Sequence, residues 1–554
     1  MRIEIVSEKL KKKGRIKMKK RMLFIAMAAI MLFVPSVMAA EVKDITSLKE
    51  CLNNGGTCKV TNNIDATTES DITISKDVNL DLNGKTLKAL LMVTGKDTVL
   101  TINSSEAGGK LIGNTASRYS AIKVDSAKLV LNSGTIVNEG GYGVYCMNGA
   151  TAIVNGGEIT SRASALGGNN TTGTMYFEIN GGTLTTEAGM SIYMPNQVSL
   201  KVTGGTLNGG ISVRMGTITI SGGTINAFNG TEKYPIDKPE DRYFSSGNLW
   251  LPDGISVLGG TYTSDAEEGN KLNLTITGGT INVDNKLGSA VAVYDFGKVK
   301  QDMKISITGG KFTTASTTRN AYDVLTLKDI GVSNPKEGYG VVNNLVTTSI
   351  TGGSFNTDVS KFVADKYTVN KTNNTYTVVE NKVLETTDEK VILESEEALN
   401  RNYYLEVTAK AEEEFNKTSE KIIETYKDNK KVKDTTLVAL YDINVLDGIQ
   451  VVPMENGEFT ISISIPESMQ KFDTYKVFYI DNDGKIAETL DAKLENGKVV
   501  FTTTHLSTYG VLGYNNVIEE NPKTYDGITT WIILGLISMS GIVGTSIYRK
   551  KQNI

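Results

Sequence analysis

The sequence is poor in the residues that most often build catalytic and metal sites. Its 554 residues include one histidine, His505, and three cysteines. A Ser-His-Asp triad or a His-rich metal site therefore cannot form away from His505. The sequence also lacks a glycine loop followed by a helix that would cradle phosphate, and a repeated aspartate motif that would bind calcium. We therefore expect no cofactor, no metal site and a structural role for His505.

The three cysteines are too few for a fold held together by disulfides. Cys51 and Cys58 lie close together in the segment CLNNGGTC and can bridge in an oxidising compartment. We predict that disulfide. Cys146 is then left over, and we expect it to be a buried, small apolar residue.

Residues 1–39 have the parts of a secretory signal peptide in the usual order. From Met18, a basic segment precedes an apolar run, and the small residues Val37 and Ala39 stand at cleavage-site spacing. We therefore predict secretion, with cleavage after Ala39. An uncleaved N-terminal anchor is the alternative, although the apolar run is short for a bilayer span of about 20 residues.

The other end contains a Pro-x-Thr element, an apolar stretch and a basic tail. The element consists of Asn521, Pro522, Lys523 and Thr524. The apolar stretch, about 528 to 548, can span a membrane with the basic tail in the cytoplasm. This order resembles the cell-wall sorting signal of Gram-positive surface proteins, although Tyr525 replaces a glycine of the consensus. The resemblance implies that a sortase attacks the carbonyl of Thr524 and links the chain to peptidoglycan. A plain C-terminal membrane anchor is the alternative.

Acidic residues predominate once the predicted signal and tail are removed. Residues 40–524 contain 45 Lys and Arg and 59 Asp and Glu, a net charge of about −14. A surface of this sign repels the phosphates of nucleic acids, so we expect no nucleic-acid partner.

A short phrase with paired glycines, such as ITGGTINVD at 276–284, recurs along the chain. We mark each copy by its second glycine or the equivalent position: Gly109, Gly134, Gly157, Gly182, Gly205, Gly223, Gly260, Gly279, Gly310 and Gly353. Six spacings are 18 to 25 residues, and the other three are 31 to 43 residues. Such a repeat is typical of a solenoid in which each copy is one coil and extra residues form loops.

Residues around each marker alternate between apolar and polar, which predicts strands, and the glycines between strands supply positive φ for sharp corners. Apolar residues two positions after the markers are expected to stack in the core: Leu111, Ile136, Ile159, Leu184, Leu207, Ile225, Tyr262, Ile281, Phe312 and Phe355. Two positions before the markers, a polar row that includes Asn132, Asn155, Asn180 and Thr203 is expected to form a ladder. We predict a right-handed parallel β-helix over residues 60–380, which resembles the pectin-lyase-like solenoids.

Both ends of a solenoid need a cap, because an open coil exposes unpaired strand edges. Residues 40–59 contain apolar residues at helical spacing, followed by glycine, so we predict a helical cap there. At the other end we expect Val359, Phe362 and Val363 to cover the last coil.

The remaining chain divides into four parts. Residues 381–435 are charged and partly helical in pattern, and we interpret them as a spacer or as a helix inserted in the next domain. Residues 436–515 alternate again and contain Asn-Gly and Asp-Gly hairpin signals, which predict a β-sandwich-like stalk domain. Residues 516–524 form a linker with the sorting motif, and residues 525–554 a transmembrane helix with its tail.

The 37-residue spacing between Gly223 and Gly260 contains a segment unlike the rest of the predicted solenoid. Residues 229–254 include Trp250, the only tryptophan of the mature chain. Aromatic rings beside carboxylates and an arginine suit sugar stacking or a protein contact. The ligand-binding residues predicted from this segment are Trp250, Tyr243, Phe244, Tyr234, Asp237, Asp241 and Arg242. The alternative is that these aromatic residues only pack the loop onto the solenoid.

Three classes of function fit these features. We favour an adhesin-like protein that is displayed on the cell wall and binds a glycan, or a host or matrix protein, through the lateral face of the β-helix. A polysaccharide lyase or glycosidase on the same face and a structural wall protein are the alternatives, and no catalytic residue is assigned. Acidic side chains that meet across neighbouring coils, about 5 to 10 Å apart, would favour hydrolysis. An aromatic shelf without them would favour binding.

Overall fold

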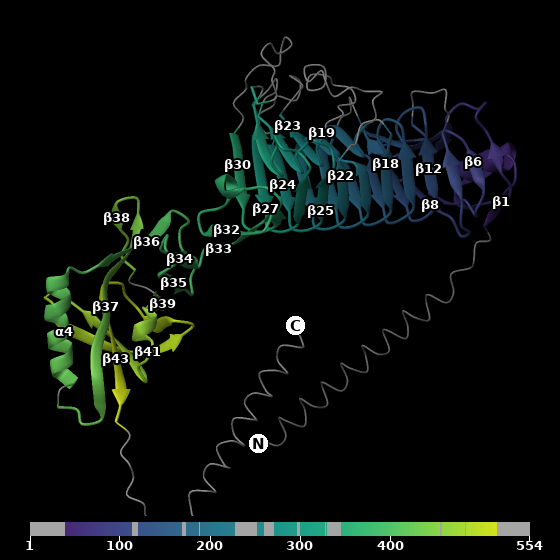
Figure 1. Ribbon diagram of the computed structural model, residues 1–554. Helices are drawn as coiled ribbons and strands as arrows, with labels where there is room; N and C mark the ends of the chain where they lie inside the picture. The colour runs from purple at the N-terminus through teal and green to yellow at the C-terminus, as the bar shows by residue number, and fades with distance from the viewer. Residues whose placement is uncertain are drawn as a thin grey trace, which may run out of the picture. The chain divides into compact units, whose positions relative to one another are not determined.

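The computed structural model describes residues 39–113, 120–168, 173–187, 189–227, 252–259, 271–295, 300–326, 328–329, 345–426, 428–454, 457–481 and 483–517. The chain is mostly β-strand and divides into two compact units, Met1–Glu380 and Asn381–Ile554 (Figure 1). The predicted signal peptide and the C-terminal segment with its sorting motif and apolar stretch lie outside these residues. Across the described ranges, no helix has the length and apolar character needed to cross a membrane.

The first unit contains two large sheets. A sheet of 20 strands covers two sides of each coil, and a sheet of 13 strands covers the third side. We name these sides face 1, face 2 and face 3, in the order in which the chain passes through them.

Face 1 consists of β4 (Ile72–Ile74), β7 (Leu91–Thr94), β10 (Ile122–Asp125), β13 (Val144–Met147), β16 (Leu166–Gly167), β23 (Ile255–Leu258), β26 (Val291–Tyr294) and β29 (Tyr322–Leu325). Face 2 consists of β1 (Ala40–Val42), β2 (Gly56–Val60), β5 (Val78–Asp81), β8 (Val99–Asn103), β11 (Lys128–Leu131), β14 (Thr151–Val154), β17 (Met175–Ile179), β24 (Lys271–Ile276), β27 (Asp302–Ile307) and β30 (Leu345–Ile350). Two strands, β19 (Ile192–Val202) and β21 (Ile211–Ile220), run through both faces.

Face 3 consists of β3 (Ile64–Asp65), β6 (Thr86–Lys88), β9 (Lys110–Ile112), β12 (Thr135–Asn138), β15 (Glu158–Ser161), β18 (Thr183–Thr186), β20 (Thr206–Gly209), β22 (Thr224–Ala227), β25 (Thr280–Val283), β28 (Lys311–Thr314), β31 (Ser354–Phe355), β32 (Tyr367–Thr372) and β33 (Thr375–Glu380). All but the last two pair in parallel with the neighbouring coils, so the structure has eleven coils on this face. These parallel sheets fit a β-helix, as the repeat predicts.

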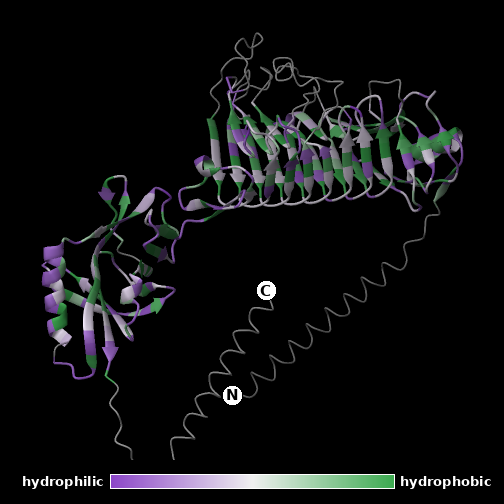
Figure 2. Cartoon of the chain, viewed as in Figure 1, coloured by the Kyte–Doolittle hydropathy of each residue, from purple (hydrophilic) through white to green (hydrophobic). Residues whose placement is uncertain are grey.

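The predicted apolar stack is confirmed on face 3. Ile159 pairs with Leu184, Leu184 with Leu207, and so on up to Phe312 and Phe355, whose rings stack with centroids 4.6 Å apart. These side chains are buried, and the polar residues just before and after them in each strand, such as those around Leu184 and Leu207, are partly exposed. Figure 2 shows the result as alternating hydrophobic and hydrophilic colours along the coils.

Two details of the predicted repeat are wrong. Gly260 was expected to mark a coil, with Tyr262 in its core, but Ile225 pairs directly with Ile281. The chain between them therefore completes one coil with two insertions, and Gly260 and Tyr262 themselves lie outside the described residues. A glycine pair alone does not define a coil when it occurs in an insertion.

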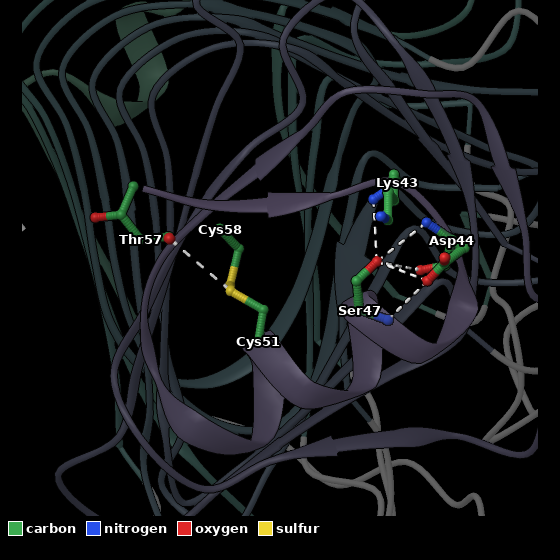
Figure 3. The surroundings of a disulfide bond; sticks show 6 residues. All are labelled: Lys43, Asp44, Ser47, Cys51, Thr57 and Cys58. Atoms are coloured by element: carbon green, nitrogen blue, oxygen red, sulfur yellow. Dashed lines mark hydrogen bonds between the residues drawn. A yellow bond between two sulfur atoms is a disulfide. The ribbon is translucent and has the colours of Figure 1, made fainter. Parts of the chain in front are cut away.

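Both ends of the parallel sheets are covered, as expected. Helix α2 (Ile45–Asn54) lies at the first coil; Asp44 caps its N-terminus by accepting a hydrogen bond from the backbone N–H of Ser47 (2.8 Å). Cys51 and Cys58 form the predicted disulfide, which joins α2 to β2 (Figure 3). At the last coil, the 3-10 helix η2 (Ser360–Phe362) and the antiparallel hairpin β32–β33 cover the core, with Val359 and Val363 buried.

The second unit begins earlier than the stalk domain predicted from the sequence. Residues 381–435 are not a spacer: they provide β34 (Val383–Glu385), β35 (Val391–Ser395), β36 (Tyr403–Ala409) and α4 (Glu412–Tyr426). Helix α4 buries Ile422 against the sheet, which agrees with the alternative of a helix inserted in this domain. Because the segment is rich in charged residues, its sequence does not reveal how many of its apolar residues face the core.

The strands of the second unit form one continuous antiparallel sheet instead of a sandwich of two sheets. The remaining strands are β37 (Val432–Asp447), β38 (Gln450–Val451), β39 (Phe459–Ser464), β40 (Thr474–Ile480), β41 (Ile486–Glu495), β42 (Lys498–Thr503) and β43 (Thr508–Asn516), with the 3-10 helix η3 (Glu467–Met469). The end strands β34 and β36 approach each other, so the sheet curls around its core. His505 has the expected structural role: its Nδ1 lies 3.0 Å from the Thr503 hydroxyl, and its ring packs edge-on against Tyr479.

Candidate functional site

The ligand-binding residues predicted from the sequence cannot be placed. Tyr234, Asp237, Asp241, Arg242, Tyr243, Phe244 and Trp250 all lie outside the described residues, as do Asn521, Pro522, Lys523 and Thr524. Their roles stay predictions. The described residues around them nevertheless define which sides of the β-helix accept insertions.

Insertions occur at the two corners that border face 1. The corner between faces 3 and 1 contains 27 residues between Ala227 and Ile255, and the corner between faces 1 and 2 contains 19 residues between Leu325 and Leu345. By contrast, the corner between faces 2 and 3 has three residues before each of β25, β28 and β31. Face 1 and its borders are therefore where the chain adds residues that the coil itself does not need.

Beside the longest insertion, a buried carboxylate connects two neighbouring coils. Asp253 is 1% exposed and accepts hydrogen bonds from the backbone N–H of Ser289 (2.9 Å), the Ser256 hydroxyl (3.0 Å) and the Tyr294 hydroxyl (2.5 Å). Burial raises the pKa of Asp253, although the bonds from Tyr294 and Ser289 and the nearby charge of Arg319 oppose that effect. Protein groups thus occupy both oxygens of this carboxylate.

A second carboxylate belongs to the same network. The Ser289 hydroxyl donates to Asp323 (2.8 Å), which also accepts bonds from the backbone and side-chain amides of Asn320 (2.8 and 2.9 Å). Because one serine bonds both carboxylates, they lie within about 10 Å of each other, a separation that glycoside hydrolysis can use. Asp323 is only 8% exposed, however. The pair meets the distance criterion for an enzyme but not the requirement that a substrate reaches it.

An open groove lies at the corner between faces 1 and 2, in the N-terminal half of the β-helix. It has a volume of about 720 Å³ and crosses four successive coils, from the turn before β8 to β17. Its lining residues are Lys96, Asp97, Val99, Ser126, Ala127, Lys128, Asn148, Gly149, Thr151 and Tyr176. The volume is in the range of small-ligand sites, which are about 300 to 1,000 Å³.

Tyr176 is the most prominent side chain of this groove. It is 51% exposed, whereas its neighbours Met175 and Phe177 are buried in the core. The backbone N–H of Tyr176 donates to the carbonyl of Ala150 (3.0 Å), which fixes the strand to the preceding coil. An exposed ring on a rigid strand offers an apolar face for stacking at little entropic cost.

The turns of the groove are ordered by local hydrogen bonds. Asn148 donates its side-chain amide to Asp125 (2.7 Å), which also accepts from the Ser126 hydroxyl (3.1 Å). Asn148 and Ser126 have positive φ, so the chain reverses sharply on consecutive coils. The groove is consequently a preformed surface with polar groups along its floor and an aromatic ring at one end.

A second groove, of about 600 Å³, lies in the other unit, where β34 and β35 approach β36. Some of its polar side chains are engaged within the protein. Lys390 pairs with Asp388 (2.8 Å), and the Tyr404 hydroxyl donates to the carbonyl of Gly448 (2.6 Å). Protein contacts thus hold Lys390 and Tyr404, two of the polar side chains that line this groove.

The described part of the chain contains no group of three or more His, Cys, Asp or Glu residues that could hold a metal ion. Cys146 is unpaired and buried, as expected, and burial raises the pKa of its thiol. Neither feature adds a reactive group to the groove.

Sequence reasoning overlooked both Tyr176 and Asp253. Tyr176 could have been found, because alternation places it on the outside of a column that otherwise contains Lys128, Thr151 and Ser199. Asp253 could not, because its partner Tyr294 is 41 residues away and only the coil register brings the two together.

Comparisons with known proteins add little to this description. No protein-family description and no curated protein sequence matches the chain. Among solved structures, the chain is similar to the enzymatically active domain of tailspike protein 4 of bacteriophage CBA120, with 10% identity over 85% of this chain and 66% of the other, slightly under two thirds of its length. The TM-score is 0.18, which is too low to carry an argument about fold or function. The fold described above accordingly rests on the strand pairing of this chain alone.

Proposed function

We propose that this chain is a cell-surface protein that binds an extracellular glycan through the lateral surface of a right-handed, pectin-lyase-like β-helix. The observation that carries the proposal is the open groove with Tyr176 exposed at its end. Sugars offer an apolar ring face and a rim of hydroxyls, and this groove offers an aromatic ring beside amide, hydroxyl and ammonium groups.

The test is a glycan array probed with the purified chain and with two tyrosine variants. Tyr176→Ala should weaken binding tenfold or more, since loss of a central contact residue typically costs about 2 kcal/mol. Tyr404→Ala is the matched control, because Tyr404 is similarly exposed, at 46%, but lies in the second unit. Parental binding by Tyr176→Ala would place the ligand elsewhere.

Trp250 and Tyr243 stay candidates for a second contact on the same lateral surface. If the ligand also reaches the insertion between β22 and β23, Trp250→Ala and Tyr243→Ala should each weaken binding without unfolding the β-helix. Unchanged affinity in both variants would restrict the binding site to the groove at Tyr176.

Display on the cell wall is part of the same proposal and rests on the sequence of residues 521–524 alone. Sortase would cleave after Thr524 and join it to peptidoglycan. Thr524→Ala should then release the protein into the medium or leave it in the membrane fraction. A normal level of the variant in the muramidase-released wall fraction would contradict this proposal.

A polysaccharide-cleaving enzyme is the second candidate, because Ser289 connects Asp253 and Asp323, which lie two coils apart. Their burial and their bonds to protein donors favour a structural role instead. An assay for new reducing ends or unsaturated uronides distinguishes the two. Cleavage that is abolished by Asp323→Asn, in a variant that stays folded, would favour the enzyme.

A further inference from the structure

We propose that the open edge of β36, in the second unit, is a docking site for an extended, basic segment of another protein. Strand β36 is one end of the antiparallel sheet, and β34 is the other. Among the described residues, no strand pairs with the outer edge of β36. A strand with an unpaired edge offers its backbone N–H and C=O groups to an incoming strand.

The register identifies the backbone groups that are available on this edge. The N–H of Lys410 donates to the carbonyl of Leu440 on β37 (3.1 Å), and hydrogen-bonded positions alternate along an antiparallel pair. The even-numbered residues of β36 therefore direct their backbone groups toward β37. The backbone groups of Leu405, Val407 and Ala409 face the other way, toward the open edge.

The groove of about 600 Å³ lies along the same positions. Leu405, Val407 and Ala409 line one side of it, and the end of β34 with the turn into β35 lines the other. The side chain of Leu405 is buried in the core of the unit, and that of Val407 is half-buried against it. An incoming strand would thus find apolar side chains beside the free backbone groups.

The lining of this groove is acidic. It contains Glu385, Asp388 and Glu406 but only one basic side chain, Lys390, so its net charge is −2. Opposite charge on a partner would therefore favour its approach and its binding.

Two lysines beside the lining, Lys410 and Lys498, do not offset its charge. Lys410 pairs with Glu414 (3.6 Å). Lys498 donates to the backbone carbonyl of Glu389 (3.2 Å), a residue that carries a negative charge of its own. Each of these lysines is thus accompanied by an acidic residue outside the lining.

The acidic side chains stand where an incoming strand would direct its outward side chains. Glu406 is exposed between Leu405 and Val407 on β36. Glu385 is exposed next to the buried Leu384 on β34. Because side chains alternate along a strand, the segment that fits this site alternates apolar residues, facing the core, with lysine or arginine, facing the two glutamates. A second copy of this chain would instead bring another acidic edge, and like charges destabilise strand pairing.

The experiment measures binding of labelled synthetic peptides to the full chain by fluorescence anisotropy. One peptide alternates valine and lysine, a second alternates valine and glutamate, and a third is the basic peptide with N-methylated backbone amides. The basic peptide should bind about tenfold more tightly than either of the others, because it alone combines edge hydrogen bonds with opposite charge. Its affinity should fall as salt increases, since the charges are exposed.

Variants of the chain locate the site. Val407→Pro removes an N–H on the open edge, where proline is tolerated, and it should abolish binding of the basic peptide. Glu385→Gln/Glu406→Gln should remove most of the preference for the basic peptide. Glu488→Gln is the matched control, because Glu488 is an exposed glutamate of β41 outside the groove.

The outcomes are independent of the proposed glycan site. Equal binding of basic and acidic peptides, undiminished binding of the N-methylated peptide, or no binding of any peptide would overturn the inference. A dimer of the chain in sedimentation equilibrium that Val407→Pro dissociates would show that a second copy occupies the edge, and would overturn it as well. Tyr176→Ala should leave peptide binding unchanged, so failure of either proposal can be told from failure of the other.

Discussion

The corner between faces 2 and 3 and the borders of face 1 differ in what each coil requires of them. At the first corner, a glycine with positive φ recurs at Gly134, Gly157, Gly182, Gly205, Gly223, Gly279, Gly310 and Gly353. At the borders of face 1, the length varies from one residue between β20 and β21 to 27 between β22 and β23. The constant corner is thus the one that stacking of the coils requires. The corners of variable length are the places where the surface can serve binding.

The largest loss of stability is expected when this repeated corner is broken. Gly279 has φ +91°, and a Cβ there would lie 3.0 Å from the carbonyl oxygen of Gly222 in the preceding coil. Gly279→Val should therefore lower the free energy of unfolding by about 3 kcal/mol or more, from backbone strain and contact with the stacked coil. Urea unfolding measures this loss.

Gly56→Val is the control, because Gly56 has φ +90° with no atom within 4 Å of the added Cβ. It should show only the backbone strain, about 1 to 3 kcal/mol. Equal losses in the two variants would show that stacking at the corner contributes nothing.

The next largest effect is expected at the border of face 1. Asp253→Ala removes the acceptor of three buried donors, those of Ser256, Ser289 and Tyr294, so it should cost about 2 to 3 kcal/mol. A variant as stable as the parent protein would contradict the structural role of Asp253.

The pH dependence of stability is a second test of the structural role of Asp253. Because the folded state raises the pKa of Asp253, its contribution to stability is fully present below the ordinary value of 3.8 and is lost as pH rises through the folded value. The stability difference between the parent protein and Asp253→Asn should therefore shift in favour of the parent as pH falls from 7 to 4. A difference that does not change with pH would show that Asp253 has an ordinary pKa.

A smaller effect is expected in the asparagine ladder. Asn155 donates to Asn132 (2.8 Å) and accepts from Asn180 (2.9 Å), whereas among the described residues the end member Asn79 only accepts from Asn103 (2.6 Å). Asn155→Ala should cost about 1 kcal/mol, and Asn79→Ala about half as much. Equal losses in thermal unfolding would mean that the ladder bonds do not stabilise the coils.

The smallest effect on stability is expected at the groove. Tyr176→Ala should change the free energy of unfolding by no more than about 0.5 kcal/mol, because the ring is half exposed. A loss of 2 kcal/mol or more in urea unfolding would mean that Tyr176 is a packing residue, and its proposed role in binding would lose its basis.

The same contrast explains how far the sequence predicted the structure. Two features were predictable, because each coil places the same type of residue at the same position: the stack from Leu111 to Phe355 and the ladder through Asn132, Asn155 and Asn180. The prediction that Gly260 marks a coil was wrong, because an insertion can contain a glycine pair without forming a coil.

The groove and the buried network were not predictable in the same way. Asp253, Ser289 and Asp323 meet only because the coil register aligns segments separated by insertions of different length. In the second unit, residues 381–435 were mistaken for a spacer, since a strand at the end of a sheet shows only weak alternation. Contacts between distant, unrepeated segments leave no periodic signal.

The central claim is that the groove at the border of faces 1 and 2 binds a glycan, and hydrogen–deuterium exchange with a ligand from the array tests it most directly. The account predicts slower exchange on binding in the segments around Val99, Lys128, Thr151 and Tyr176, with no change at the corner that contains Gly279. Slower exchange confined to the second unit, or no change in any segment of the groove at a saturating ligand concentration, would contradict it.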